Sequence, residues 1–469
     1  EQAGPQPGRA PLVAATPGPP PSHSRLFGLA TSRDRYIHAH SIRMEGGRGS
    51  ESLVDDQVNC KKVTHRQLVM NLICGGLGTG MFSLPSSTAG SSLLPAFLMM
   101  LGMVALNAWT IMILVEAAEA KQVFDIGALL GMLPGRVLPG RLGRRLPGLG
   151  SFTQAFINCM VCVVCMISLI SYLIVINDSL EPFLQNILSR TTIVSLAALM
   201  MIPLCFLNQR YLSWTSTIAF VVNIYIIGLM IALYTQKSLQ KELPPGACLL
   251  GVGKGVIAML AVLGQCFVVQ MCVLPMYQEL ENRSPRTFKH CLLTAFGALT
   301  IIFGAFAFLG YLTFGPEVEG NALKQLPPTA LAHAAQIGTI LVVSALYPIM
   351  AIPMVAPVRN MRLEDCACPR RLVTTLATLM IVLVSWAGAL SFKKLLFVNV
   401  IGGALCVGIF AGVAPGLAGL CLLETRSKAW KLLMTFLLIF GIGNAVLGVV
   451  FNENYQEDIA SHCAVPVLA

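Results

Sequence analysis

Long apolar runs dominate the pattern of hydrophobic and polar positions from residue 68 onward. A helix needs about 20 apolar residues to cross the roughly 30 Å hydrocarbon core of a bilayer. Within the runs the apolar positions are continuous rather than alternating, which favours membrane-spanning helices over the strands of a barrel. The eleven predicted spans, of which the fourth is short, are 68–90, 93–117, 152–176, 191–207, 212–234, 255–278, 290–312, 330–358, 372–391, 396–423 and 432–451.

The charges between these runs predict an orientation. If the N-terminus is cytosolic, the loops on that side hold sixteen Lys and Arg residues and the opposite loops hold seven. Because basic residues concentrate in cytosolic loops, we expect a cytosolic N-terminus and, after eleven spans, a C-terminus on the outer side. We expect 1–66, which begins with a proline-rich stretch, to be a disordered cytosolic tail, 67–451 to form one transmembrane domain and 452–469 to be a short C-terminal tail.

Composition agrees with a membrane protein and excludes other classes. Hydrophobic residues make up 55% of the 469 residues and charged residues 12%, whereas soluble proteins carry about 25% charged residues. This supply of charge is too small for a soluble enzyme, a nucleic-acid-binding module or a disordered scaffold. The net charge of +10 is explained by the loops. Most of the fifteen cysteines lie in apolar runs, where we interpret them as small helix hydrophobes, so we expect no metal or cofactor.

The first span contains an interruption. Gly75, Gly76, Gly78 and Gly80 fall within six positions, and Pro85 follows. Each glycine disfavours a helix by about 1 kcal/mol relative to alanine, and unwound backbone inside a membrane must line a cavity or be buried in protein. A helix that restarts near Gly80 would direct its positive end toward an anion such as a carboxylate, and the freed carbonyls could hold a cation. The alternative is close helix packing through the Gly76–Gly80 spacing.

The sixth span contains a second interruption. Gln265 and Gln270 are polar, and Pro275 removes a backbone hydrogen bond. Taken alone, an interhelical glutamine contact and a proline kink explain these residues. Taken with the first span, they indicate a secondary transporter, because interrupted helices at matching positions of two halves mark its binding site. Spans one and six lie five apart, and this odd number of crossings means that spans 6–10 would repeat spans 1–5 in inverted orientation, with the eleventh outside the repeat.

Three motifs in order point to a family. Gly78–Pro85 reads GTGMFSLP, Val273–Pro285 reads VLPMYQELENRSP, and Gly310–Gly315 reads GYLTFG, followed by Val318 and Asn321. They resemble the GxGxLxLP, "vlPiyeEL…rsp" and "GYlaFG…v.gN.L" motifs of the amino acid/auxin permease family, also called the transmembrane amino acid transporter family, although Phe82 replaces the usual Leu. The resemblance covers about 62–451.

The resemblance implies a fold and a function. The expected fold is an all-α polytopic membrane protein with about eleven transmembrane helices, a LeuT-like five-plus-five inverted repeat plus one extra helix, and an N-in/C-out orientation. The expected function is secondary active transport of amino acids by alternating access, with 67–451 as the transporter domain. We expect no enzymatic reaction, no nucleic acid partner, and a plasma membrane or vacuolar or lysosomal location. A membrane amino-acid sensor that barely transports is the alternative, and an ion channel is less well supported because charge rings and filter motifs are lacking.

The resemblance also assigns site residues. The backbone around Gly78, Thr79 and Gly80 would hold the substrate carboxylate, and the neutral second break favours a neutral amino acid. The substrate-binding residues expected are Gly75, Gly78, Thr79, Gly80, Gln270, Met271 and Cys272. Sodium-coupled members carry Asn where this chain has Cys74, so proton coupling or facilitated transport is favoured over sodium. Thr339 and Ser344, like Cys74, are candidates for ion coupling, because hydroxyls of span eight could reach a cation beside the first break.

Other polar residues allow two interpretations each. Glu116 and Glu119 in span two could relay protons, although interfacial anchoring also explains them. His333 could sense pH or be a solvated residue at a loop end. Asn177-Asp178-Ser179 forms a glycosylation sequon close to the membrane on the predicted outer side.

Overall fold

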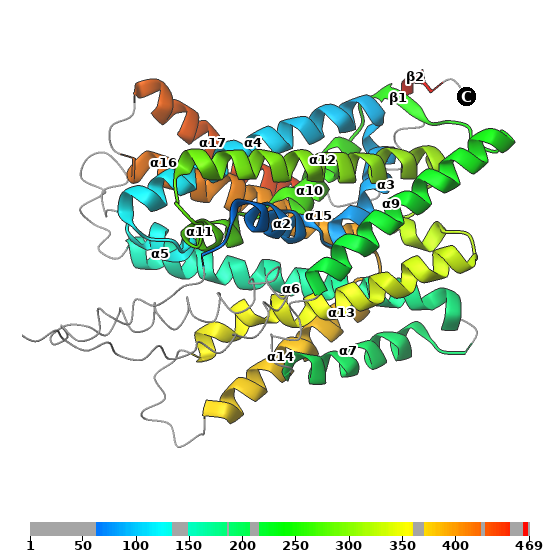
Figure 1. The fold of residues 1–469 in the computed structure, drawn as a ribbon, viewed down its shortest axis with the longest axis horizontal. Helices are drawn as coiled ribbons and strands as arrows, with labels where there is room; N and C mark the ends of the chain where they lie inside the picture. Colours follow the sequence, from blue (N-terminus) through cyan, green and yellow to red (C-terminus); the bar gives the residue numbers. More distant parts are fainter. Residues whose placement is uncertain are drawn as a thin grey trace, which may run out of the picture.

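Helices make up nearly all of the part of the chain that the structure describes (Figure 1). The computed structural model describes residues 62–133, 149–184, 187–206, 215–359, 370–423, 427–450 and 463–467. Its helices are α2 (His65–Gly76), η1 (Thr79–Ser83), α3 (Leu84–Ser91), α4 (Leu93–Lys121), α5 (Ile126–Gly131), α6 (Leu149–Leu184), α7 (Arg190–Phe206), α9 (Thr215–Gln240), α10 (Gly255–Phe267), α11 (Gln270–Gln278), α12 (Pro285–Phe314), η3 (Ala322–Gln325), α13 (Ala330–Arg359), α14 (Arg370–Ser391), α15 (Leu395–Leu405), η4 (Cys406–Val413), α16 (Ala414–Cys421) and α17 (Lys428–Val450), and its strands are β1 (Cys248–Gly251) and β2 (Cys463–Pro466).

Every predicted apolar run contains a helix or a broken helix. Nine helices among the described residues are long and apolar enough to cross a membrane, and the pair α2 and η1–α3, bent by 48°, adds a tenth. The fourth run forms α7, which has only 17 residues. The number of eleven spans and the orientation therefore stay predictions, although the positions of the helices agree with them.

The predicted N-terminal tail meets the structure only at its inner end. Residues 1–61 of the expected N-terminal tail lie outside the described residues, and α2 begins at His65, earlier than the expected domain boundary. Just before α2, Val63 pairs with the end of α11, since its N–H donates to Glu279 O at 2.9 Å and its carbonyl accepts from Glu281 N at 3.0 Å.

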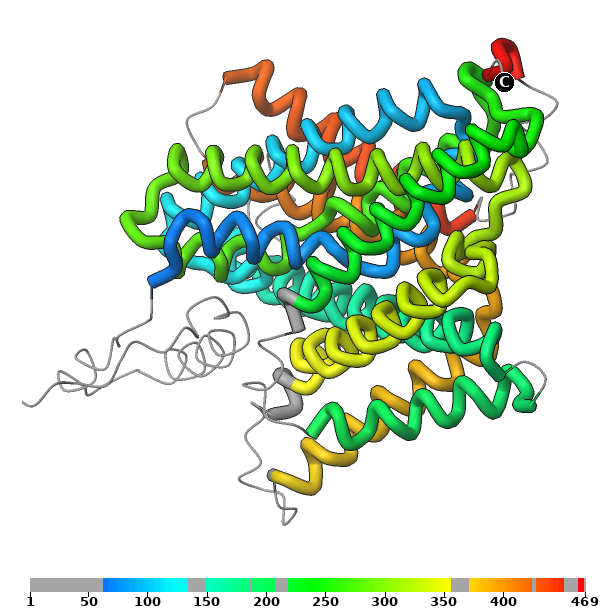
Figure 2. Tube along the Cα trace, turned by 45° about the vertical axis from the view of Figure 1, so that its right-hand side comes forward, coloured from blue at the N-terminus to red at the C-terminus, as the bar shows by residue number. Residues whose placement is uncertain are grey.

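The long helices lie side by side in two groups (Figures 1 and 2). The broken helices α2–η1–α3 and α10–α11 pack with α4 and α12. A second group contains α6, α7, α13 and α14, and α9 bridges the groups through contacts with α12 and α13. Aromatic rings fix the first group, where Phe267 of α10 meets Phe296 and Phe303 of α12 edge to face at 6.1 and 5.1 Å. Large apolar side chains such as Ile301 and Leu341 are exposed and would face lipid.

One end of the molecule carries a covalent link. β1 pairs antiparallel with β2, and a disulfide joins Cys248 to Cys463 across them, with the Cα atoms 5.8 Å apart. The disulfide places the loop after α9 and the C-terminal tail on one face of the molecule. The predicted topology requires this, because six spans lie between them and an even number of crossings returns the chain to the same side. Disulfides persist in oxidising compartments, which agrees with an outer location for both. Interpreting the cysteines as helix hydrophobes did not anticipate this link.

Candidate functional site

The first helix break lies at Leu77–Gly78. α2 ends at Gly76, and Leu77 (φ −74°, ψ 97°) and Gly78 (φ −136°, ψ −171°) are extended. The helix restarts at Thr79 as the 3₁₀ segment η1 and continues as α3. The break predicted from the glycine cluster is therefore present, and the restart lies one residue before Gly80.

The second break lies at Val268–Val269, between the two glutamines. α10 ends at Phe267, and Val268 has φ −79° and ψ 99°. These angles differ from those of Leu77 by 5° and 2°. Pro275, which was expected to take part in the interruption, lies inside α11. Spans one and six thus begin their breaks in the same conformation, whereas the second residues differ, with ψ −171° at Gly78 and ψ 8° at Val269.

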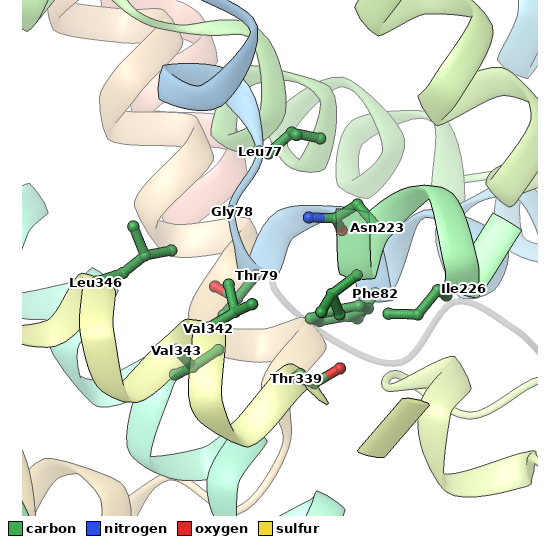
Figure 3. Close-up of a pocket in the computed structure, with 11 residues that line it drawn as sticks. Leu77, Gly78, Thr79, Phe82, Asn223, Ile226, Thr339, Val342, Val343 and Leu346 are labelled. Atoms are coloured by element: carbon green, nitrogen blue, oxygen red, sulfur yellow. The ribbon is translucent and has the colours of Figure 1, made fainter. Parts of the chain in front are cut away.

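A cavity lies beside the first break, with a volume of about 300 Å³ including its open mouth (Figure 3). Gly78 and Thr79 form one wall, Asn223 of α9 and Thr339 of α13 contribute polar groups to the others, and the rest of the lining is apolar. Asn223 and Thr339 each donate a hydrogen to their own helix, to Ala219 O at 2.7 Å and to Ala335 O at 2.8 Å. Their side-chain oxygens therefore keep lone pairs for a ligand or cation.

Asn399 of α15 holds the unwound backbone. Its amide nitrogen donates to Thr79 O at 3.3 Å and to Ser83 Oγ at 2.9 Å, and its oxygen accepts from Ser171 Oγ of α6 at 3.1 Å. Unwound carbonyls inside a membrane must find such donors. Sequence reasoning missed Asn399, although an amide in the middle of an apolar run was a usable signal.

Comparison with known proteins decides the family. The profile of the family described as "Transmembrane amino acid transporter protein" matches residues 61–452. The chain belongs to this family. It is a multi-pass membrane protein, and its family consists of transporters rather than enzymes.

Individual relatives are distant. Amino acid transporter AVT1J of Arabidopsis thaliana is 23% identical over 439 residues, which cover 87% of this chain and 93% of the relative. Vacuolar amino acid transporter 4 of Saccharomyces cerevisiae is 22% identical over 470 residues, 89% of this chain and 63% of the relative. Solute carrier family 38 member 10 of Homo sapiens is 26% identical over 100 residues, and the matched part is only 9% of that protein's length.

Solved transporter structures share the fold. The inward-facing conformation of Mhp1 superposes with a TM-score of 0.56 at 10% identity, covering 85% of this chain and 91% of Mhp1. A substrate-bound outward-open Na⁺-coupled sialic acid symporter gives a TM-score of 0.50 at 12% identity, covering 94% and 98%. These similarities confirm the predicted LeuT-like transporter fold, which is helical apart from the short β1–β2 pair.

In this chain, three of the expected site residues line the cavity together: Gly78, Thr79 and Thr339. Gly75 is exposed and faces Met276 of α11, because a Cβ placed there would lie 3.9 Å from the Met276 Cε. Gly80 is packed against α10, where an added Cβ would lie 2.9 Å from Cys266 Sγ. For Gly80 the structure therefore favours the close-packing interpretation.

The other expected residues do not line this cavity. Gln270 is buried and points to α4, where its Nε2 donates to Asn107 Oδ1 at 2.8 Å and to Thr110 Oγ1 at 3.3 Å. Its Oε1 has no hydrogen-bond partner among the described residues. The neighbouring residues of α11, together with the two remaining ion-coupling candidates, are half-buried and lie elsewhere: Met271, Cys272, Cys74 and Ser344.

Glu119 takes part in a cluster at the opposite end of the fold from the disulfide. Its carboxylate accepts from Tyr277 Oη at 2.9 Å and pairs with Arg283 Nε at 3.1 Å. The Arg283 guanidinium also lies 4.3 Å from the centre of the Phe124 ring. These contacts join α4, α11 and the segment before α12, which supports anchoring rather than a proton relay for Glu119.

The glycosylation sequon lies inside the fold. Asn177 is only 2% exposed, on the buried face of α6. A sugar cannot be accommodated there, so the sequon is not a surface site.

Proposed function

We propose that this chain is a secondary active transporter that moves neutral amino acids across a membrane by alternating access. The observation that carries the proposal is the pair of matched helix breaks, with a cavity at the first one. Unwound backbone at the same place in two halves of a chain is the arrangement that secondary transporters use to bind substrate. The names of the relatives AVT1J and vacuolar amino acid transporter 4 point to amino acids as the cargo.

The first break suits the α-carboxylate of an amino acid. η1 and α3 form a run of helix from Thr79 to Ser91 whose first N–H groups have no carbonyl of their own helix to bind. These groups and the helix dipole favour a negative group at Thr79, beside the cavity. Asn399 already occupies the Thr79 carbonyl on the other side, so the backbone is held in this conformation before a substrate arrives.

The lining of the cavity favours a neutral side chain. Val222 and Ile226 of α9 and Val342 and Val343 of α13 supply apolar walls. Among the described residues, the lining includes no Asp, Glu, Lys or Arg. A charged side chain would lose its hydration there without gaining a counter-ion, which costs several kcal/mol. Apolar walls instead gain about 25 cal/mol for each Å² of apolar surface that they bury.

We further propose that protons drive transport, or that transport is facilitated, rather than sodium-driven. The support is Cys74, which replaces the Asn of sodium-coupled members. The oxygens of Thr339 and Asn223 beside the first break could bind a cation, so sodium coupling is the alternative that the experiment must test. We place the protein in the plasma membrane or in the membrane of a vacuole or lysosome.

Uptake by reconstituted proteoliposomes tests this function. A panel of labelled neutral, acidic and basic amino acids should be offered with a proton gradient and a sodium gradient imposed separately. We expect uptake of neutral amino acids that follows the proton gradient or runs without a gradient. Uptake that requires sodium would overturn the coupling proposal, and saturable binding without any flux would replace the transporter with a sensor.

A further inference from the structure

Asp178 is the only charged side chain that is buried in the described part of the chain. It lies near the end of α6 on the same face of the molecule as the disulfide loop, and 5% of it is exposed. An isolated buried carboxylate loses several kcal/mol of hydration. Such a group either finds donors and cations or binds a proton.

Asp178 is tied to the segment between α12 and α13. Asn321 Nδ2 donates to Asp178 Oδ2 at 2.9 Å, and the Asn321 side chain also caps η3 by accepting from Leu323 N at 3.2 Å. η3 carries Lys324, whose Nζ lies 3.1 Å from Glu181 Oε2 of α6 and 3.6 Å from Glu319 Oε2. The carboxylate therefore fastens η3 to α6.

The charges around Asp178 come from three elements. Lys324 of η3 and Glu181 of α6 interact with its charge, and Glu319 of the preceding loop pairs with Lys324. His333 of α13 has its ring 4.7 Å from that of Phe183, which follows on α6. Burial opposes the charge of Lys324, but the nearby carboxylates outweigh burial and raise the pKa of this lysine. Lys324 therefore stays a cation that favours the ionised form of its neighbours.

The site already holds an acceptor for a protonated Asp178. Asn177 Nδ2 donates to Asp178 Oδ1 at 3.3 Å, while Asn177 Oδ1 and Ser179 Oγ are buried without a hydrogen-bond partner among the described residues. Nearly all buried polar atoms in proteins are paired. If the Asn177 amide turns over, a protonated Asp178 donates its O–H to Asn177 Oδ1 and pairs that atom.

A chain of hydrogen bonds connects this site to the first break. Gly320, next to Asn321, accepts from Ser83 Oγ of η1 at 2.8 Å. Ser83 in turn accepts from Asn399, which also donates to Thr79 O. Movement of the segment around η3 therefore reaches the backbone where we place the substrate.

We propose that Asp178 binds the proton that makes uptake respond to pH, and that this proton releases the η3 segment from α6. One O–H bond forms with a proton from the outer solution, and the reverse step returns the proton. Neutral Asp178 no longer attracts Lys324 and accepts more weakly from Asn321, so the η3 segment, which Gly320 joins to Ser83 of the first break, loosens from α6. This inference rests on the proposed function, because it names the group through which protons act on that transport.

The test measures initial uptake in proteoliposomes as the outer pH falls from about 8 to about 5, a range in which a buried carboxyl can bind a proton. The wild-type rate should rise as the pH falls. Asp178→Asn, which mimics the neutral form, should transport at a rate that changes less than about twofold across this range. Glu181→Gln is the matched control, since it removes a carboxylate one turn away, and it should keep the pH response. An Asp178→Asn protein that keeps the wild-type response would overturn the proposal.

A second variant leaves Asp178 intact, in case Asp178→Asn does not fold. Lys324→Met removes the cation that favours the carboxylate, so the pH of half-maximal uptake should move upward. An unchanged midpoint would also overturn the proposal. Exchange of labelled for unlabelled amino acid at equal pH distinguishes a failure of the Asp178 proposal from a failure of the proposed transport function, because exchange needs no net proton movement. Absent exchange in the wild-type protein contradicts the proposed function itself.

Discussion

Replacing Gly78 by valine should close the cavity at the first break without disturbing the fold. A Cβ built on Gly78 meets no heavy atom within 4 Å. The backbone at this residue, with φ −136°, is in the extended region that β-branched residues adopt readily. The valine side chain should therefore enter the cavity that Gly78 lines, at the place proposed for the substrate.

The expected changes in melting temperature and in substrate binding distinguish Gly78→Val from its matched control, Gly80→Val. Gly78→Val avoids the roughly 1–3 kcal/mol of overpacking, so its melting temperature should stay close to wild type. It should weaken substrate binding at least tenfold, about 1.4 kcal/mol. Gly80→Val places a Cβ 2.9 Å from Cys266 Sγ and 3.2 Å from Gln265 Cγ, so it should incur the overpacking cost and melt earlier.

The assay combines thermal unfolding in detergent with amino acid uptake in proteoliposomes. Normal uptake by Gly78→Val would refute the assignment of this cavity to the substrate. Equal destabilisation by both valine variants would refute the packing geometry.

Three further changes test other parts of the structure. Asn399→Ala removes the amide that holds Thr79 O and Ser83, so we expect a loss of about 1–3 kcal/mol of stability and slower uptake. An unchanged melting temperature and unchanged uptake would contradict this role of Asn399. Glu119→Gln weakens a partly exposed ion pair, so the free energy of unfolding should change by at most about 1 kcal/mol. The pH response of uptake should persist, and loss of that response would restore a proton-relay role for Glu119. Cys463→Ser opens the disulfide to Cys248, so we expect a lower melting temperature with uptake retained. The freed Cys248 should react with a thiol reagent added on the outer side, and labelling only from the cytosolic side would contradict the predicted orientation.

The broad architecture could be predicted because its signals are local. Continuous apolar runs predicted the positions of the helices, and the glycines from Gly75 to Gly80 predicted the first break within a few residues of Leu77–Gly78. The second break was predicted less accurately. Gln265, Gln270 and Pro275 weaken the helix together, but tertiary contacts decide where it opens, and α11 tolerates Pro275 while the chain unwinds at Val268–Val269.

The composition of the site could not be predicted in the same way. Which face of a helix meets a cavity depends on packing, so Gln270 points to Asn107 instead of the cavity, and Asn223 lines the cavity although it was not a candidate. The disulfide joins cysteines 215 residues apart, which no local pattern reveals. Asp178 was noted only as the middle of a sequon, because burial cannot be read from a helix end near a membrane surface.

A structure determined with a saturating neutral amino acid tests the central claim most directly. We expect the ligand in the cavity between the first break, α9 and α13, with its carboxylate at the N–H groups that begin η1, its side chain against the apolar walls, and Asn399 still bound to Thr79. A ligand bound elsewhere, with this cavity unchanged, would contradict the account.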